Sequence, residues 1–249
     1  MNERPRVSFV VPVYNEPEAI GATLASIDDH CRDPHEVLVV YDFDEDTTLP
    51  VVRELLPDSP TVRLVRNDIG RGVLNAMRKG MQEARGAHII VSMADGSDDH
   101  RAVDAMVALA DDGADVVAAS RYMRGGRQIG GPRLKGLLSR MAGVSLHYFG
   151  GVGTHDATNN FKLYRRSFLD AVTIESRGGF ELALELTVKA TLMGRRVAEV
   201  PAVWRDRTAG QSNFKLRAWL PSYLHWYLAL FRGRIGEAFG RGSRSGDAA

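Results

Sequence analysis

Apolar runs alternate along the first half of the chain with segments of helical periodicity. The runs are rich in β-branched residues and indicate buried strands; they are Val7–Val11, Glu36–Val40, Val62–Val65, Ile89–Val91 and Asp115–Ser120. Helices are predicted where apolar residues recur on one face; the sets are Ile20, Leu24 and Ile27, then Val52, Leu55 and Leu56, then Val73, Leu74, Met77 and Met81, then Val103, Met106, Val107 and Ala110. Strands alternating with helices predict an α/β fold with a mostly parallel sheet covered on both faces.

An acidic turn follows the strand at Ile89–Val91 and is the centre of the predicted site. Asp95 is the first acid after that strand. Parallel sheets bind ligands at the carboxyl ends of their strands, so Asp95 is predicted to face a ligand there. Asp98 and Asp99 come later, and we interpret them as caps of the next helix.

Other polar turns are predicted at the same edge of the sheet. The first strand leads into Asn15 and Glu16, and the second leads into Asp42 and its acidic neighbours. Repeated acids at one edge favour a cation or the hydroxyls of a ligand. Gly70-Arg71-Gly72 precedes a helix, and two interpretations stay open: backbone N–H groups that cradle a phosphate, or a plain glycine turn.

A basic run follows the strand that ends at Ser120. Its cationic residues are Arg121, Arg124, Arg127, Arg133, Lys135 and Arg140. A solvated face is the usual meaning of such a run, but its place among glycines at a strand end also suits anion binding. Further on, Glu181 and Glu185 share one face of a predicted helix. We leave open whether they face solvent or a site.

Composition narrows the classes of function. The chain has 249 residues, a formal net charge of +1 and one cysteine, Cys31. This charge gives no case for a nucleic-acid partner, and the lone cysteine fits a reducing, cytoplasmic compartment. We expect no signal peptide before the first strand. The predicted domains are an α/β domain at 1–215, a helical segment at 216–236 and a disordered tail at 237–249.

The segment 216–236 is rich in tryptophan and tyrosine, with basic flanks at Lys215, Arg217, Arg232 and Arg234. It is interrupted by Pro221 and is shorter than the roughly 20 apolar residues of a spanning helix. We expect an amphipathic helix at a membrane interface. The competing interpretation is a core or dimer helix.

Seven motifs stand in the order found in family 2 glycosyltransferases. They are Val11–Glu16, the Asp42 turn, Asn67 with Gly70–Gly72, Met93–Asp99, Ser120–Tyr122, Asp156–Lys162, and Val200–Pro201 leading to Arg207–Lys215. Together they resemble that family, and within it most closely the dolichyl- or polyprenyl-phosphate mannose and glucose synthases. The likeness covers about Val7 to Lys215 and implies the GT-A nucleotide-sugar fold.

The resemblance also implies roles for individual residues. Donor binding is implied for Pro12, Tyr14, Glu16, Asp42, Asn67, Gly72, Asp95, Arg207 and Ser212. Asp95, assisted by Ser97, matches the position that binds Mg²⁺ or Mn²⁺ on the diphosphate. The acceptor phosphate is expected at Arg121, Arg133 and Lys135, and the catalytic set is expected to be Asp95, Arg121 and Lys215.

Three positions depart from the family pattern. Met93 stands where the first acid of the DxD motif is expected, so either another acid substitutes for it or metal dependence is weaker. Tyr41 stands beside Asp42 where another acid is frequent. Asn160 and Lys162 stand where small and arginine residues are frequent.

The resemblance, together with the basic run after Ser120, predicts an inverting glycosyltransferase. Such an enzyme would move a hexose from a GDP- or UDP-sugar to a polyprenyl or dolichyl phosphate. A phosphate acceptor needs no general base, and the candidate bases are limited to Glu181, Glu185 and Asp156. Two alternatives are a hydroxyl acceptor on a soluble metabolite or glycan, and a non-catalytic nucleotide-sugar-binding protein. We expect a peripheral enzyme at the cytoplasmic face of the membrane, with a second copy or a membrane protein left open as a partner.

Overall fold

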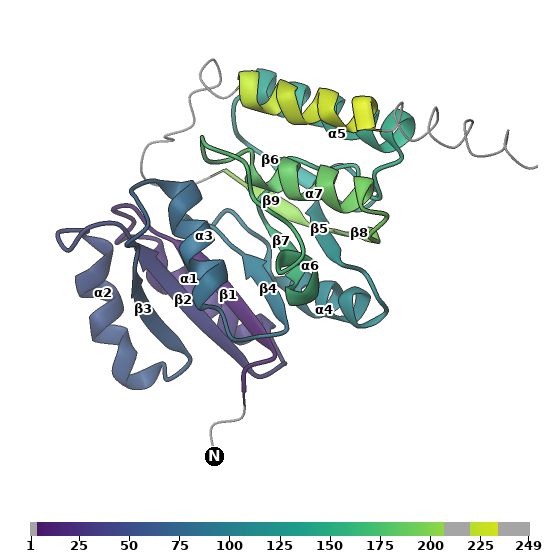
Figure 1. The fold of residues 1–249 in the computed structure, drawn as a ribbon. Helices are drawn as coiled ribbons and strands as arrows, with labels where there is room; N and C mark the ends of the chain where they lie inside the picture. Colours follow the sequence, from purple (N-terminus) through teal and green to yellow (C-terminus); the bar gives the residue numbers. More distant parts are fainter. Residues whose placement is uncertain (1–3, 207–219, 234–249) are drawn as a thin grey trace, which may run out of the picture.

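A seven-stranded sheet forms the centre of the molecule, in the strand order β3-β2-β1-β4-β7-β5-β8 (Figure 1). The computed structural model describes residues 4–206 and 220–233. The sheet strands are β1 (Val7–Pro12), β2 (His35–Tyr41), β3 (Val62–Arg66), β4 (His88–Val91), β5 (Val116–Ser120), β7 (Lys162–Arg165) and β8 (Val197–Pro201). Those from the predicted apolar runs are parallel, as expected for strands joined by helical crossovers.

Helices cover both faces of the sheet because successive strand residues point to opposite sides. One face packs on α1 (Ile20–His30), α2 (Thr48–Leu55) and α4 (Val103–Asp111). The other packs on α3 (Val73–Glu83), α6 (Arg166–Leu169) and α7 (Leu182–Leu192). In β1, Phe9 and Val11 enter the first core while Val10 enters the second. Two 3₁₀ turns, η1 (Leu56–Asp58) and η2 (His100–Ala102), complete the connections.

The second half of the chain departs from simple alternation. Among the described strands of the large sheet, β7 runs antiparallel to its neighbours β4 and β5. A separate parallel pair joins β6 (Arg127–Ile129) to β9 (Val203–Arg205). The basic run was not predicted to be helical, yet much of it lies in α5 (Arg133–Gly150).

A third core lies between α5, α7 and a helix at residues 220–233, here called the C-terminal helix. Trp226 and Leu230 of that helix are buried against Leu146 and Val188. Figure 1 shows it in yellow beside α5, at one end of the molecule. Within the described ranges, no helix is both long enough and apolar enough to cross a bilayer. The predicted tail at 237–249 lies outside the described residues.

Candidate functional site

The turn after β4 carries Asp95 at the carboxyl end of the sheet, as the sequence predicted. The Ser97 amide donates a hydrogen bond to Asp95 Oδ1 at 3.1 Å, and Gly96 between them has a left-handed φ of 71°. A glycine adopts that conformation without strain, so it lets the turn close tightly. The Ser97 residue is buried. We call residues 92–99 the acidic turn.

The interpretation of Asp98 as a helix cap is wrong, and Asp99 takes the N-cap position of η2 without a side-chain capping hydrogen bond. Asp98 turns back toward the strand, where its Oδ2 accepts hydrogen bonds from the Met93 amide at 2.8 Å and the Ser92 hydroxyl at 3.2 Å. The Asp99 carboxylate binds the Arg101 guanidinium through both oxygens, and Oδ2 also accepts from the Val203 amide at 3.0 Å. Asp98 therefore stabilises the acidic turn from within, whereas Asp99 connects it to Arg101 and to Val203.

The environment of Asp98 raises the pKa of its carboxyl group. Burial raises the pKa of Asp98 to about 7, and the neighbouring negative charge of Asp95 acts in the same direction. Asp98 lies beside the backbone of Met93, the residue that replaces the first acid of the motif. The fold therefore places the Asp98 carboxyl group beside Met93, although Asp98 comes later in the sequence.

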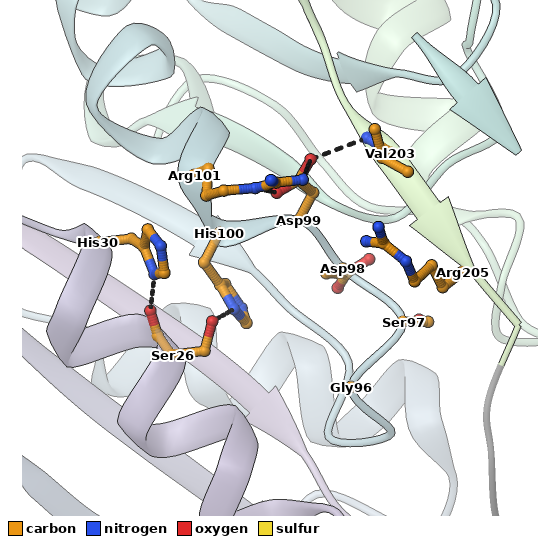
Figure 2. A pocket seen from close by; sticks show the side chains of 10 residues that line it. All are labelled: Ser26, His30, Gly96, Ser97, Asp98, Asp99, His100, Arg101, Val203 and Arg205. Atoms are coloured by element: carbon orange, nitrogen blue, oxygen red, sulfur yellow. Dashed lines mark hydrogen bonds and ion pairs between the residues drawn. The ribbon is translucent and has the colours of Figure 1, made fainter. Parts of the chain in front are cut away.

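A chain of side-chain contacts ties the acidic turn to α1. His100 contacts the Ser92 hydroxyl through Nε2 at 2.9 Å and the Ser26 hydroxyl through Nδ1 at 3.0 Å. Burial lowers the pKa of His100 to about 4, so the ring is neutral at pH 7. The contact between Ser26 and His100 lies at a cavity of about 170 Å³. Figure 2 shows the side chains of Asp98 and Arg205 turned toward each other in this cavity.

Hydrogen bonds connect strand β9 to the acidic turn. The Arg205 amide donates to the Ser97 carbonyl at 3.1 Å, next to the contact between Val203 and Asp99. Further along the sequence, the predicted donor-binding residues Arg207 and Ser212 and the predicted catalytic residue Lys215 lie outside the described residues.

At the turn after β2, Asp42 binds the loop that precedes α3. Its two carboxylate oxygens accept from Asn67 Nδ2 and from the Gly72 amide, both at 2.7 Å. Asn67 Nδ2 also donates to the Gly70 carbonyl at 2.5 Å. The Gly72 amide, one of the groups proposed as a phosphate cradle, is thus directed to a carboxylate, and turn chemistry explains this glycine. Asp42, Asn67 and Gly72 nevertheless lie together, as predicted.

The turn after β1 lies against the turn after β2. Pro12 ends β1 in the buried core, and the exposed ring of Tyr14 packs edge-on against Phe43 at 5.6 Å between centroids. Asp46 accepts from the amide of Asn15, and the Glu16 amide donates to the Thr48 hydroxyl. The exposed Tyr14 ring and the half-buried Phe43 ring form an apolar rim beside Asp42, which suits a nucleoside base. The anchoring role of Asp46 was not predicted, although it belongs to the acidic cluster after β2.

Arg121 is paired within the protein. Its Nε and Nη2 donate to the two carboxylate oxygens of Asp156 at 2.7 and 2.8 Å, and its backbone amide adds a bond at 3.0 Å. Although burial alone would raise the pKa of Asp156, the Arg121 charge holds that pKa below its usual value. Asp156 is therefore a poor general base, and the arginine has a fixed orientation.

Arg121 lies in a cavity of about 570 Å³ bounded by β6 and the start of α5. Four arginines line this arginine cavity: Arg121, Arg127, Arg133 and Arg140. The structure thus brings Arg121 and Arg133 together as predicted, whereas Lys135 is not among the lining residues. Guanidinium groups recognise phosphate oxygens through paired hydrogen bonds, so the cavity is suited to a phosphate group.

The two glutamates considered as bases are buried rather than solvent-facing. Glu181 accepts from the amides of Gly178 and Gly179, and Glu185 accepts from the amides of Glu175 and Ser176. Glu185 also pairs with Lys189 at 2.8 Å. These contacts stabilise the loop before α7, so the structure gives both acids a structural role.

The side chains at the acidic turn that could bind a metal ion are few, which suits an ion held mainly by the phosphate oxygens of a substrate. Within residues 4–206 and 220–233, there is no group of three or more His, Cys, Asp or Glu side chains placed to bind a metal ion. Mg²⁺ commonly takes one or two carboxylates together with substrate phosphates. Asp95, followed in sequence by Ser97, fits such a site next to a diphosphate.

Comparison with known proteins agrees with this geometry. Residues 8–173 match the model of the family described as glycosyl transferase family 2. A polyprenol monophosphomannose synthase of Mycolicibacterium smegmatis is 30% identical over 244 residues, covering 94% of this chain and 91% of the relative. An undecaprenyl-phosphate mannosyltransferase of Micrococcus luteus is 29% identical, covering 84% of this chain and 87% of the relative.

Solved structures share the fold. A mannosyltransferase from Pyrobaculum calidifontis, solved with GDP-Man and Mn²⁺, has a TM-score of 0.63 at 22% identity, covering 91% of this chain and 64% of that one. Glucosyl-3-phosphoglycerate synthase from Mycobacterium tuberculosis, solved with Mn²⁺ and UDP, has a TM-score of 0.64 at 17% identity, covering 93% and 80%. With the family model spanning most of the sheet, the chain belongs to glycosyl transferase family 2.

Proposed function

We propose that this protein transfers a hexose from a nucleotide sugar to a polyprenyl phosphate with inversion at the anomeric carbon. The observation that carries the proposal is the arginine cavity beside α5, a helix that exposes leucines and aromatic rings. A phosphate on an apolar chain requires cationic groups next to an apolar surface. The relatives named for polyprenol- and undecaprenyl-phosphate mannosyl transfer support the same acceptor class.

The donor would bind along the carboxyl ends of β1, β2 and β4. Tyr14 and Phe43 flank the base, and Asp42 with Asn67 lies close to the ribose. Asp95 and Ser97 would hold Mg²⁺ or Mn²⁺, which neutralises the charge that develops on the departing diphosphate. This set directs the leaving group toward the acidic turn.

The acceptor phosphate would enter the arginine cavity and place one oxygen against the anomeric carbon. That oxygen is already anionic, so the transfer proceeds without a general base. The three acids considered as bases are engaged elsewhere: Asp156 with Arg121, and Glu181 and Glu185 with loop amides. Arg133 and Arg140 would then hold the remaining phosphate oxygens.

Peripheral binding at the cytoplasmic face of a membrane is part of this proposal. Helix α5 exposes Leu134, Leu137, Leu138, Met141, Tyr148 and Phe149, and its charged side chains are the basic Arg133, Lys135 and Arg140. The C-terminal helix exposes Leu220, Leu224 and Leu228, each four residues apart. An apolar face with basic neighbours matches an anionic lipid surface.

A transfer assay tests the proposed reaction. GDP- and UDP-sugars would be offered with and without polyprenyl phosphate, in the presence of Mg²⁺ or Mn²⁺, and the products would be identified by mass spectrometry. We expect a glycosyl phosphate lipid with inverted anomeric configuration. A glycoside on a soluble hydroxyl would support the alternative acceptor, and tight donor binding without turnover would support a non-catalytic protein.

A further inference from the structure

Lys162 is a lysine at the centre of the large sheet. It begins β7, in register with Val91 of β4 and Ala118 of β5, and its exposed fraction is 0%. Lysines are rarely buried in this way without partners that compensate the charge. The sequence singled it out as a departure from the family pattern, and the proposed reaction assigns it no role.

The ammonium group is enclosed by one loop. Its Nζ donates to the carbonyl oxygens of Asp156 and Ala157, both at 3.2 Å, and to that of Asn159. An ammonium has three N–H donors, whereas a neutral amine has two. Three carbonyls therefore match the charged form, and the neutral form would leave one of these buried acceptors without its partner.

The same loop supports the arginine cavity. Its first residue, Asp156, binds Arg121 through both carboxylate oxygens. The Thr158 hydroxyl lies 2.6 Å from that of Ser139 on α5, and Asn159 Nδ2 donates to the Ala119 carbonyl at 2.8 Å. We call residues 156–159 the cavity loop, because it connects α5, β5 and Arg121.

We propose that Lys162, as an ammonium, is a positioning residue that holds the cavity loop and, through Asp156 and Arg121, sets the geometry for binding the acceptor phosphate. This inference rests on the proposed function only in naming the phosphate. Lys162 does not touch the cavity itself, because its three donors face the loop carbonyls. It acts through the loop that orients Arg121.

The charges around Lys162 make this support sensitive to pH. Burial lowers the pKa of Lys162 to about 7, and Arg121 acts in the same direction, while Asp156 and Glu199 oppose the shift. As pH rises through about 7, the folded protein loses this proton and the cavity loop loses a donor. In the unfolded chain the lysine keeps the proton up to a pKa of about 10.4. The contribution of Lys162 to stability is therefore lowest below about pH 7 and increases above it.

Acceptor binding and the contribution of Lys162 to stability should thus change in opposite directions with pH. The experiment measures KM for farnesyl phosphate, a short polyprenyl phosphate, between pH 6 and 8.5 at saturating nucleotide sugar. For one group with a pKa near 7, KM of the wild-type protein should rise about tenfold from pH 6 to pH 8. Unfolding by urea at each pH provides the stability readout.

Two substitutions isolate the ammonium. Lys162→Arg keeps a cation that does not titrate in this range, so its KM should stay nearly constant once the ionisation of farnesyl phosphate is accounted for. Lys162→Met should show, already at pH 6, the high KM that the wild type reaches at pH 8. Lys189→Met serves as the matched control, because Lys189 is a mostly buried lysine whose carboxylate partners, Glu175 and Glu185, lie outside the cavity.

Donor affinity, measured by calorimetry with the nucleotide sugar, should stay the same in all variants. The same rise of KM in wild type and Lys162→Arg would overturn the proposal, as would a low, wild-type KM in Lys162→Met. If neither variant folds, hydrogen exchange of the backbone amides at 156–160 in the wild type provides the test. Their protection should fall between pH 6 and 8. Unchanged protection would refute the role of Lys162. Failure of the wild type to glycosylate any polyprenyl phosphate would refute the proposed function instead, while hydrogen exchange still tests Lys162.

Discussion

At the scale of single residues, Arg121 shows how one side chain serves both packing and chemistry. Its guanidinium neutralises the buried Asp156 and lies within 3.1 Å of the Ser139 hydroxyl. Replacing it with alanine would leave a buried carboxylate without its partner, which costs about 3–5 kcal/mol. Loss of activity in such a variant would mix instability with lost phosphate binding. Asp95, on a partly exposed turn, permits a cleaner test.

We expect Asp95→Asn to lower kcat by roughly 10²–10⁴-fold, because ~3–5 kcal/mol of charge stabilisation by the metal would be weakened. The amide keeps an acceptor for the Ser97 N–H, so the fold should be retained. Steady-state kinetics and Mn²⁺ binding in the presence of the nucleoside diphosphate are the measurements. Asp112→Asn, at a surface ion pair with Arg196, is the matched control. Normal turnover in folded Asp95→Asn would remove Asp95 from the site.

At the scale of elements, α5 and the C-terminal helix each have a buried face and an exposed apolar face. The Tyr227 hydroxyl lies 3.0 Å from that of Ser145, and a Cβ on Gly150 would come within 2.4 Å of Leu230, so the two helices pack closely. The sequence left open whether this segment is a core helix or an amphipathic helix with an exposed apolar face. The C-terminal helix has both a face in the core and an exposed apolar face. Deleting it would expose Leu146 and Val188 as well as remove its outer leucines. Surface substitutions are thus the better test of membrane binding.

We expect the combined variant Leu134→Ser, Met141→Ser and Phe149→Ser to bind anionic liposomes at least tenfold more weakly, because each side chain contributes on the order of 1 kcal/mol when partly buried in lipid. None of the three lines the arginine cavity, and Phe149 is 77% exposed. Co-sedimentation at low and high salt measures the binding. Ile69→Ser, on the loop before α3, should bind normally. Equal binding of all variants would exclude this face, and a concentration-dependent dimer would identify it as a contact between copies.

At the scale of the whole molecule, the residues of the proposed site and a residue that stabilises the fold lie at opposite edges of the sheet. Its carboxyl edge carries Asp42, Asp95 and the cavity loop, while its amino edge carries Glu36 near the start of β2. Glu36 is buried and accepts from the Ser8 hydroxyl and the Arg85 amide, both at 2.7 Å, and from Arg63 Nε at 3.0 Å. This carboxylate joins β1, β2, β3 and the chain after α3.

We expect Glu36→Ala to lower the free energy of unfolding by about 2–4 kcal/mol, because it leaves the buried Ser8 hydroxyl and the Arg85 amide without their acceptor. The fraction that remains folded should have the wild-type kcat, since the substitution lies at the opposite edge from the acidic turn. Urea denaturation and kinetics at low temperature measure the two quantities. A smaller loss is expected for Glu36→Gln, which keeps one acceptor. A large drop in kcat of folded protein would contradict this separation of roles.

Local patterns were sufficient for the first half of the fold. The strands before β5 and the helices between them follow from periodicity, and their parallel order places Asp42 and Asp95 at one edge. Helix α5 has the same kind of signal in Leu134, Leu137, Leu138 and Met141, but the basic run was interpreted by its charge alone. Those interpretations depend on neighbours in sequence, where period and propensity act.

The partners of the buried charges could not be predicted in this way. Arg121 and Asp156 are 35 residues apart, Lys162 is enclosed by a loop whose carbonyls carry no side-chain signal, and the orientation of β7 depends on the strands on either side of it. Asp98 looked like a helix cap because caps are local, but its hydrogen bonds run back to the strand end. Such contacts form only when distant segments fold together, because burial determines which charged groups must find partners and the topology determines which partners lie within reach.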